Sequence, residues 1–473
     1  MKNHPKALPY LFLTEMWERF GFYIVQGLLV LYMTEYYGYS DSDSYSILGA
    51  FTALAYIAPI LGGILADRFL GFKTAIVWGG FILLLGYAFL ALPFGKLSLY
   101  PGLATVIVGT GLFKPNISSI LGHQYRIDDP RRDSGFTIFY IGINVGAFLA
   151  GLSSGYIKEY FGWHVSFALA SIGLAIGLAT FAIGHRTIHG GGEKRALNHQ
   201  LKLTLLFYFL LAIIAITFLL TMTALTNWVL PSAGVILLVV LTTLTMQQDA
   251  EGRKRMILLN TLILSSIIFW MLYLQMFFSA NLFIDRLVNK NIFGLHLTTT
   301  VFYASESIFI ILLGPIFAWA WSLLGMNQKN PSPISKFIFG ILFAGLGFLV
   351  LSIGALFPDS QGFVNPFWIF GGYLLITVGE LLLSPIGLSA VTQLAPQNLV
   401  GMMMGVWFVA LGFGGIFAGM IAKLSSIPDT VTSTAGKLAI YQTAFMDFAY
   451  LAFFVTIVLF FIRAGLKKYL RGV

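Results

Sequence analysis

The feature that most constrains this chain is a series of fourteen long apolar stretches separated by short polar segments. A helix of about 20 apolar residues crosses the hydrocarbon core of a membrane, whereas barrel strands are about ten residues long and alternate in polarity. These stretches are too long and too uniformly apolar for barrel strands. We therefore predict an all-α integral membrane protein with fourteen spans over residues 8–36, 45–66, 74–94, 98–122, 134–157, 163–184, 202–222, 226–246, 256–280, 298–324, 334–357, 365–393, 399–424 and 442–465.

The composition excludes several classes of protein. Of the 473 residues, 10% are charged and 58% are hydrophobic, against about 25% and 45–50% in soluble domains. A soluble enzyme, a nucleic-acid-binding protein and a disordered chain are therefore excluded. The absence of cysteine excludes disulfides and cysteine metal sites. Because charged residues interrupt the first stretch and no small-residue cleavage site follows it, we expect no cleavable signal peptide.

The basic residues predict the topology, because Lys and Arg gather in cytoplasmic loops. With the N-terminus inside, twenty of the 28 basic residues fall on the inner side and six on the outer side, while Arg19 and Lys114 lie at membrane depth. We therefore expect a multi-pass protein of the cell (inner) membrane with both termini cytoplasmic. The short loops and the absence of cysteine are typical of a bacterial protein.

The segment after the sixth stretch divides the chain. His185 to Lys202 contains Gly190-Gly191-Gly192 and is interpreted as a flexible cytoplasmic linker, and only Leu225-Thr226-Asn227 separates the next two stretches. We interpret these two as an inserted accessory hairpin, since removing them leaves six plus six spans. The predicted domains are an N-terminal six-helix bundle (1–184), the linker and hairpin (185–255) and a C-terminal six-helix bundle (256–473).

Six ionisable residues fall within the predicted spans: Glu15, Glu18, Arg19, Lys114, Glu306 and Glu380. Such a residue at the bilayer centre costs about 2.5–3.5 kcal/mol on insertion scales and therefore needs a partner or a function. Four carboxylates and two cations leave a formal charge of −2, which in a low-dielectric cavity favours protonation of carboxylates. The arithmetic suggests proton coupling.

The spacing of the first three residues places them on one helical face, because Glu15, Glu18 and Arg19 stand at i, i+3 and i+4. They form either a carboxylate cluster tuned by Arg19 or an interfacial turn whose charges reach the cytosol. Lys114 precedes Pro115, which bends the fourth stretch. A lysine at such a bend favours a contact with substrate or ions over a structural ion pair.

The second half of the chain supplies carboxylates. Glu380 precedes the bend at Pro385, or else is satisfied by neighbouring backbone, and Glu306 is predicted to lie shallower than Glu380. A zwitterion would fit between the two halves, with its carboxylate toward Arg19 and Lys114 and its ammonium toward Glu380. Polar side chains that could bind amides are Asn144, Tyr23, Tyr56 and Ser384, and aromatic walls could come from Trp270 and Trp407, although interhelical packing explains any one of them equally well.

A charged segment joins the second and third stretches. Asp67, Arg68 and Lys73 are interpreted as a clasp that holds the inner ends of these spans in one conformation, and thus as a gate. Elsewhere the sequence shows no pair of metal-binding histidines, no Ser-His-Asp set and no phosphate-binding loop. We therefore expect neither an enzyme nor a metal or cofactor, and His123 alone carries no prediction.

Several motifs resemble those of a known family. Gly63 to Lys73 resembles the loop motif of the major facilitator superfamily, and Glu15-Met16-Trp17-Glu18-Arg19-Phe20 resembles the first-helix ExxERF motif of its proton-dependent oligopeptide transporters. The segments Gly111 to Asn116, Phe136 to Gly146 and Gly379 to Leu388 resemble the fourth-, fifth- and tenth-helix motifs of the same family. Four motifs in the right order are specific, and bacterial members carry the extra hairpin.

The resemblance implies a major facilitator fold of twelve helices in two six-helix bundles plus two accessory helices. It implies alternating-access symport of di- and tripeptides with protons, driven by the proton gradient without a cofactor, and we expect a functional monomer. By motif position it assigns proton coupling to Glu15, Glu18, Arg19 and Lys114. It assigns substrate contacts to Arg19 and Lys114 (carboxylate), to Tyr23, Tyr56 and Asn144 (backbone), to Glu380 (amino end) and to the aromatic pocket residues Trp270 and Trp407. We also expect Gln275 and Ser384 to contact the substrate.

The chain departs from the family pattern at a few positions. Phe22 precedes Tyr23 where two tyrosines are common, and Gln26 stands where many bacterial members have arginine. Leu274 precedes Gln275 where many members have an acidic residue, and Glu306 stands where asparagine is usual. We hypothesise that the acidic residue usual in the seventh helix is replaced in this chain by Glu306 of the eighth, near the ammonium end of the peptide. Glu306 should then favour peptides with an extra cation. Equal uptake of Ala-Lys and Ala-Ala by the wild type and Glu306→Gln would contradict this.

Three other interpretations compete with peptide symport. The same fold could carry nitrate, a drug-like molecule or an amino acid conjugate, although Glu380 argues against a simple anion. A membrane enzyme such as an acyltransferase would need a nucleophile–base pair or metal ligands near an interface. A receptor or structural protein would leave the ionisable residues within the spans without a function.

Overall fold

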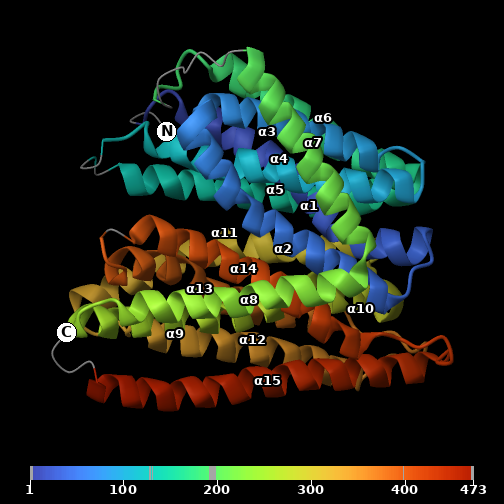
Figure 1. The fold of residues 1–473 in the computed structure, drawn as a ribbon. Helices are drawn as coiled ribbons and strands as arrows, with labels where there is room; N and C mark the ends of the chain where they lie inside the picture. The colour runs from blue at the N-terminus through green and yellow to red at the C-terminus, as the bar shows by residue number, and fades with distance from the viewer. Residues whose placement is uncertain (1–3, 127–128, 130, 191–198, 398, 470–473) are drawn as a thin grey trace. The chain divides into compact units, whose positions relative to one another are not determined.

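The computed structural model describes residues 4–126, 129, 131–190, 199–397 and 399–469 and is almost entirely helical (Figure 1). Its α-helices are α1 (Leu8–Leu31), α2 (Asp41–Leu65), α3 (Phe72–Leu90), α4 (Lys96–Gly122), α5 (Arg132–Phe161), α6 (Trp163–Gly184), α7 (His199–Thr221), α8 (Thr223–Met246), α9 (Ala250–Tyr273), α10 (Ser279–Leu287), α11 (Thr299–Met326), α12 (Pro333–Ala355), α13 (Phe367–Leu394), α14 (Val400–Ala422) and α15 (Thr434–Tyr469). In the described part of the chain, every predicted span overlaps a long helix. α10 is an additional short one.

Shorter elements join or extend these helices. Two π-helical turns, Tyr32–Tyr36 and Ala66–Leu70, continue α1 and α2, and two 3₁₀ turns, Leu274–Met276 and Lys423–Ser425, follow α9 and α14. The strands β1 (Asn291–Ile292) and β2 (Leu295–His296) form an antiparallel hairpin between α10 and α11.

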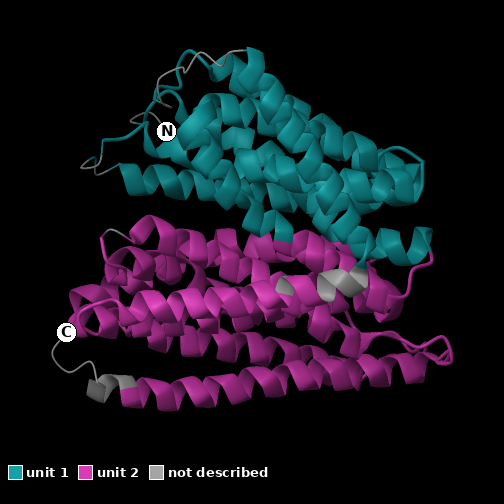
Figure 2. Cartoon of the chain, in the orientation of Figure 1, with its two compact units in different colours: residues 1–37, 54–226 teal, residues 38–53, 227–473 magenta. Residues whose placement is uncertain are grey.

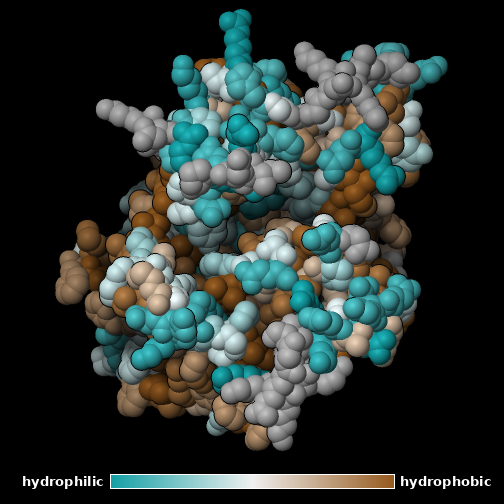
Figure 3. Space-filling view, turned by 90° about the vertical axis from the view of Figure 1, so that its left-hand side faces the viewer, coloured by the Kyte–Doolittle hydropathy of each residue, from teal (hydrophilic) through white to brown (hydrophobic). Residues whose placement is uncertain are grey.

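Twelve helical segments in the searched, described residues are long and apolar enough to cross a membrane. α1 is not among them because Glu15, Glu18 and Arg19 interrupt it, and α8 contributes only the shorter apolar segment Pro231–Met246. Large apolar side chains face outward along these helices; Phe461 of α15, for example, is 68% exposed. Figure 3 shows hydrophilic residues gathered over one face that carries helix ends, with hydrophobic residues toward its margins. The chain is a multi-pass membrane protein.

The chain divides into two compact units, which Figure 2 shows in two colours. Unit 1 comprises residues 1–37 and 54–226, and unit 2 comprises residues 38–53 and 227–473. The division passes through α2 and α8, so that the first half of α2 clusters with the C-terminal helices. The three predicted domains, with limits at 184 and 255, stay a prediction.

Each unit is held by a few extensive helix contacts. In unit 1, α1 packs against α5 and α6, and α3 packs against α4. α7 joins this unit through an apolar cluster in which Leu205 and Phe209 pack near Leu112 and Ala75. In unit 2, α12 lies between α13 and α15, and α9 packs against α14.

One predicted boundary was wrong. The accessory helices are separated at Met222, whose N–H still bonds to the carbonyl of Phe218, and not at 225–227. Thr226 and Asn227 instead lie in the first turns of α8, which begins at Thr223. The ninth stretch lies within one candidate span, Ala250–Leu287, inside which α9 ends at Tyr273 and α10 begins at Ser279. Of the predicted glycine linker, residues 191–198 lie outside the described part.

Glycine lets α2 and α4 approach each other closely. Gly62 of α2 faces the backbone of Gly111 on α4, and a Cβ atom added to Gly62 would overlap the carbonyl group of Gly111. Only a residue without a side chain fits such a backbone contact, as is common between membrane helices. This contact lies one turn from Lys114 and therefore fixes the height of α2 beside that lysine.

We expect Gly62→Ala to destabilise unit 1 by about 1–3 kcal/mol or more, because overpacked backbone contacts cannot relax without moving a helix. The neighbouring Gly63 is a matched control, since a Cβ there would meet only Pro115 at an ordinary 3.9 Å. Thermal unfolding of both variants in the same detergent measures the effect. Similar melting temperatures for Gly62→Ala and Gly63→Ala would contradict the packing argument.

Candidate functional site

The acidic turn of α1 is buried and internally paired. Glu15 and Glu18 are fully buried and Arg19 is 2% exposed. The Arg19 guanidinium donates two hydrogen bonds to the carboxylate of its neighbour Glu18, and its Nε lies 3.6 Å from Oε1 of Glu15. The arrangement contradicts the alternative of an interfacial turn that reaches the cytosol, because none of the three side chains is exposed.

Lys114 of α4 completes this cluster. Its Nζ donates a hydrogen bond of 2.9 Å to Oε1 of Glu15. Pro115 is accommodated inside a continuous α4, and the amide of Asn116 donates to the carbonyl of Leu112 at 2.6 Å. The lysine side chain keeps 26% of its surface exposed. Lys114 is therefore the member of the cluster that a ligand can reach.

The packing of α5 against α1 buries the cluster. Gly146 of α5 lies against the carbonyl of Met16, with the Cβ of Arg19 also near it, so a side chain at this position would push α5 away. The Arg19 guanidinium in turn lies over the ring of Phe22, 4.7 Å from its centroid. α1 is thus enclosed on the side that carries its charges.

The ionisable residues within the predicted spans carry different formal charges in the two units. Glu15, Glu18, Arg19 and Lys114 sum to zero, so the cluster in unit 1 is neutral when all four are ionised. One carboxylate oxygen, Oε2 of Glu15, has no hydrogen-bond partner among the described residues. The charge of −2 counted in the sequence therefore belongs to the carboxyls of unit 2.

The other candidate residues of unit 1 lie on three helices. Tyr23 and Tyr56 are half-buried, and each has its ring near that of Phe22, at 5.9 and 6.3 Å respectively. Asn144 is 5% exposed, and its amide donates to the carbonyl of Tyr140 at 3.1 Å. Phe22 thus links both tyrosines to Arg19, which places them around the charged cluster.

In unit 2 the structure brings Glu306 of α11 and Glu380 of α13 together. Both are 6% exposed, and their carboxyl groups are within hydrogen-bonding contact. The hydroxyl groups of Tyr273 and Ser307 each donate to Glu306 at 3.3 Å. Oε2 of Glu380 has no partner among the described residues. The prediction that Glu306 lies shallower than Glu380 stays a prediction, although the ends of the two side chains meet.

The remaining candidates in unit 2 surround this pair or support its helices. Trp270 is 6% exposed and packs edge-on against Tyr273 at 5.2 Å between ring centroids. Trp407 is 2% exposed and packs near Phe337. Ser384, one turn after Glu380, is half-buried.

The amide of Gln275 is occupied by its own surroundings. Its nitrogen donates to the carbonyls of Met271 and Ala418, and its oxygen accepts from Ser279 at 2.6 Å. These bonds stabilise the break between α9 and α10 against α14. A substrate contact by Gln275 stays a prediction.

The predicted gate residues lie near the junction of α2 and α3. Asp67 and Arg68 belong to the π-helical turn that continues α2, and both are exposed. Lys73 donates to the carbonyl of His185 at 3.2 Å, at the end of α6. The clasp itself stays a prediction.

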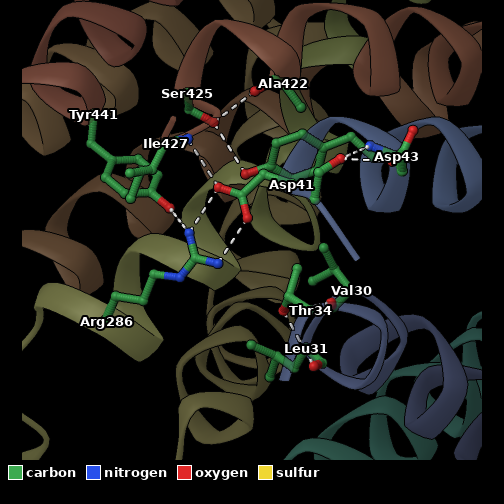
Figure 4. A network of polar contacts seen from close by, with 12 residues as sticks. Val30, Leu31, Thr34, Asp41, Asp43, Arg286, Ala422, Ser425, Ile427 and Tyr441 are labelled. Atoms are coloured by element: carbon green, nitrogen blue, oxygen red, sulfur yellow. Dashed lines mark hydrogen bonds and ion pairs between the residues drawn. The ribbon is translucent and has the colours of Figure 1, made fainter. Parts of the chain in front are cut away.

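A second charged network was missed by the sequence analysis (Figure 4). Arg286 of α10 makes a bidentate pair with Asp41 at the start of α2, with both N–O distances at 2.8 Å. Asp41 also accepts from the backbone N–H of Ile427 at 3.1 Å, and Tyr441 lies 3.4 Å from the guanidinium. All of these residues belong to unit 2, so the network holds the first turn of α2 to α10 and α15.

Asp129, outside the helices, is less suited to carrying protons. In the segment between α4 and α5, hydrogen bonds from the Arg131 side chain and backbone lower the pKa of Asp129 to about 2. This carboxylate is therefore ionised throughout the neutral range. No group of three or more His, Asp or Glu side chains able to hold a metal occurs in the residues searched.

Buried ion pairs inside a bundle of lipid-facing helices define a polytopic membrane protein with an internal polar site. A sequence model of the POT family matches residues 73–438, and the chain belongs to this family. The recognition made from the four motifs is confirmed.

The chain is similar to relatives of known name along nearly its whole length. Dipeptide and tripeptide permease A of Proteus mirabilis (strain HI4320) is 36% identical over 471 residues, which cover 98% of this chain and 96% of that protein. The protein of the same name from Escherichia coli (strain K12) is 34% identical over 450 residues, covering 94% and 89%.

Two solved structures share the fold. A mutant of the peptide transporter POT in complex with alafosfalin is 32% identical, with a TM-score of 0.86 and coverage of 99% of this chain and 96% of that chain. Tetrameric PepTSo2 is 29% identical, with a TM-score of 0.87 and coverage of 98% and 99%. The predicted major facilitator fold is confirmed.

Proposed function

We propose that this protein is a proton-coupled symporter that imports di- and tripeptides by alternating access. The observation that carries the proposal is the buried network of two carboxylates and two cations formed by Glu15, Glu18, Arg19 and Lys114. Membership in the POT family and relatives named dipeptide and tripeptide permease support peptides as the substrate.

The network couples protonation of Glu15 to binding of the peptide carboxylate through charge balance. It is neutral when all four groups are ionised, so a proton added to Glu15 leaves one positive charge in excess. Lys114, which is bonded to Glu15 and is partly exposed, then becomes available to a peptide carboxylate. Each event favours the other by the same free energy, because the coupling between two ligands is reciprocal.

We assign the other substrate contacts by chemistry. Arg19 and Lys114 hold the peptide carboxylate, and Glu380 with Glu306 holds the ammonium. The peptide backbone and side chains meet Tyr23, Tyr56, Asn144, Trp270, Gln275, Ser384 and Trp407, and the gate is formed by Asp67, Arg68 and Lys73. The protein acts as a monomer in the bacterial inner membrane, with both termini cytoplasmic and without a cofactor or catalytic residues.

A different solute on the same fold is the second candidate. The observation that favours it is the solved relative in complex with alafosfalin. A peptide-like drug that competes with labelled dialanine for gradient-driven uptake would extend the substrate range. Competition by nitrate instead would argue against the ammonium site assigned to Glu380.

The experiment that tests peptide symport is uptake of labelled dialanine into liposomes that contain the purified protein. Concentrative uptake that requires an inward proton gradient and is lost in Glu18→Gln is the expected result, because that change removes the carboxylate paired with Arg19. The exposed Glu251, which pairs with Arg255 on the same helix face, provides the matched control Glu251→Gln. Folded wild-type protein without dialanine uptake would contradict the proposal.

A further inference from the structure

The two carboxyls of unit 2 form an unusual pair. Glu306 and Glu380 come from different helices, are each 6% exposed and lie within hydrogen-bonding contact. Two carboxylates in contact cannot both be ionised at low cost, whereas one proton between them makes a strong hydrogen bond. The contact therefore requires that an empty pair hold at least one proton.

The hydrogen-bond donors around the pair favour a negative charge on Glu306 and the proton on Glu380. Tyr273 and Ser307 both donate to Glu306, which stabilises a negative charge there. Oε2 of Glu380 accepts from no described group. The pair thus has a buried acceptor, Oε2 of Glu380, that lacks a hydrogen-bond donor among the described residues.

No cation of the neighbouring helices neutralises the pair within the described residues. α14 contains no charged residue, and the charges of α9 lie in its first two turns. On α12, Lys336 lies over the ring of Trp321 at 4.0 Å. On α10, Asp285 pairs with Lys290 and Arg286 pairs with Asp41. The other titratable groups on the packed helices are the hydroxyls of Tyr303 and Tyr373.

We propose that Glu306 and Glu380 hold one shared proton, and that the side-chain ammonium of a cationic peptide replaces this proton. The inference rests on the proposed function, since it names the peptide class that the site selects. In the exchange, the ammonium donates N–H bonds to both carboxylates, and the displaced proton leaves to water. One positive charge enters and one leaves, so the charge of the site is conserved.

Charge balance distinguishes two kinds of peptide. The α-ammonium of Ala-Ala neutralises the single negative charge of the pair, which keeps its proton. Ala-Lys brings a second ammonium, and the pair can accept it only by giving up the proton. Binding of Ala-Lys should therefore release about one proton more than binding of Ala-Ala, by proton linkage. Protons that both dipeptides take up or release through their shared groups, the α-ammonium and the carboxylate, cancel in the comparison.

Isothermal titration calorimetry measures this difference. Each peptide is titrated into detergent-purified protein near neutral pH, in two buffers with different ionisation enthalpies, which gives the number of protons released. The expected difference between Ala-Lys and Ala-Ala is about one proton in wild type and in Glu251→Gln, and none in Glu306→Gln. Equal release by both peptides in wild type, or a difference that survives in Glu306→Gln, would overturn the exchange while leaving peptide binding intact.

An infrared measurement tests the shared proton without any peptide. The carbonyl band of protonated carboxyl groups is recorded near neutral pH for wild type, Glu306→Gln and Glu380→Gln. Loss of intensity in both variants supports the pair, and unchanged intensity in both overturns it. If neither peptide binds to the folded wild type, the proposed function fails by itself, and the infrared result still decides whether the pair shares a proton.

Discussion

Lys114→Ala should lose gradient-driven peptide uptake by at least about 100-fold. The change removes the cation bonded to Glu15 at 2.9 Å and leaves this fully buried carboxylate with only Arg19, at 3.6 Å. Breaking a buried pair by removing one partner costs about 3–5 kcal/mol, and each 1.4 kcal/mol corresponds to about a factor of ten. Of the two cations in the cluster, the variant also loses the one that is partly exposed. Both proton coupling and binding of the peptide carboxylate should therefore be weakened.

Uptake of labelled dialanine with and without an inward proton gradient measures the loss. Lys158→Ala is the matched control, because Lys158 forms an ion pair of 2.8 Å with Glu35 in the same unit but outside the buried cluster. Counterflow of dialanine without a gradient separates the two roles of Lys114. Residual counterflow would assign the lysine to coupling alone, and gradient-dependent uptake near the wild-type rate would contradict both roles.

The fold could be predicted because the membrane restricts the choice of structure. Long apolar stretches must be helical to satisfy their backbone groups, so length and hydropathy suffice to find the spans. Interruptions such as the break at Leu274–Met276 could not be predicted, because their backbone is satisfied by partners such as Gln275, whose amide bonds to the carbonyl of Ala418 on α14. Such partners depend on tertiary packing.

The site could be predicted where its residues share one helix. Glu15, Glu18 and Arg19 follow the period of a helix, and their clustering needs no knowledge of the fold. The partner of Lys114 lies 99 residues away, so spacing could show only that the lysine needed one. The contact between Glu306 and Glu380 was missed because depth was judged along each helix separately, and the vertical offset between α11 and α13 is set by packing.

The pair of Asp41 and Arg286 shows the limit of local patterns most clearly. The two residues are 245 positions apart, and each lies near a helix end, where charged residues are common and carry little information. The only signal in the sequence was their rarity, since few residues of this chain are charged. A charged residue near the end of an apolar stretch should therefore be expected to form an ion pair with a residue far away in the sequence.

Asp41→Asn and Arg286→Gln should each destabilise unit 2 by about 2–3 kcal/mol. This is below the 3–5 kcal/mol typical of a fully buried pair, because the Arg286 side chain keeps 26% of its surface exposed. Removing one partner leaves the other charge partly desolvated, whereas the double variant leaves neither. The double variant should therefore be more stable than the sum of the single changes implies, by about 1–2 kcal/mol.

Thermal unfolding in detergent of the wild type, the two single variants and the double variant provides the cycle. Exchanging the charges, with Asp41→Arg and Arg286→Asp, should not restore stability, because the N–H of Ile427 donates to Asp41 and would then face a guanidinium. The exposed pair of Glu251 and Arg255 is the control, and its loss should change stability by less than about 0.5 kcal/mol. Strict additivity of the two single changes would mean that the contact between Asp41 and Arg286 contributes nothing, and that the first turn of α2 is held in unit 2 by the remaining bonds alone.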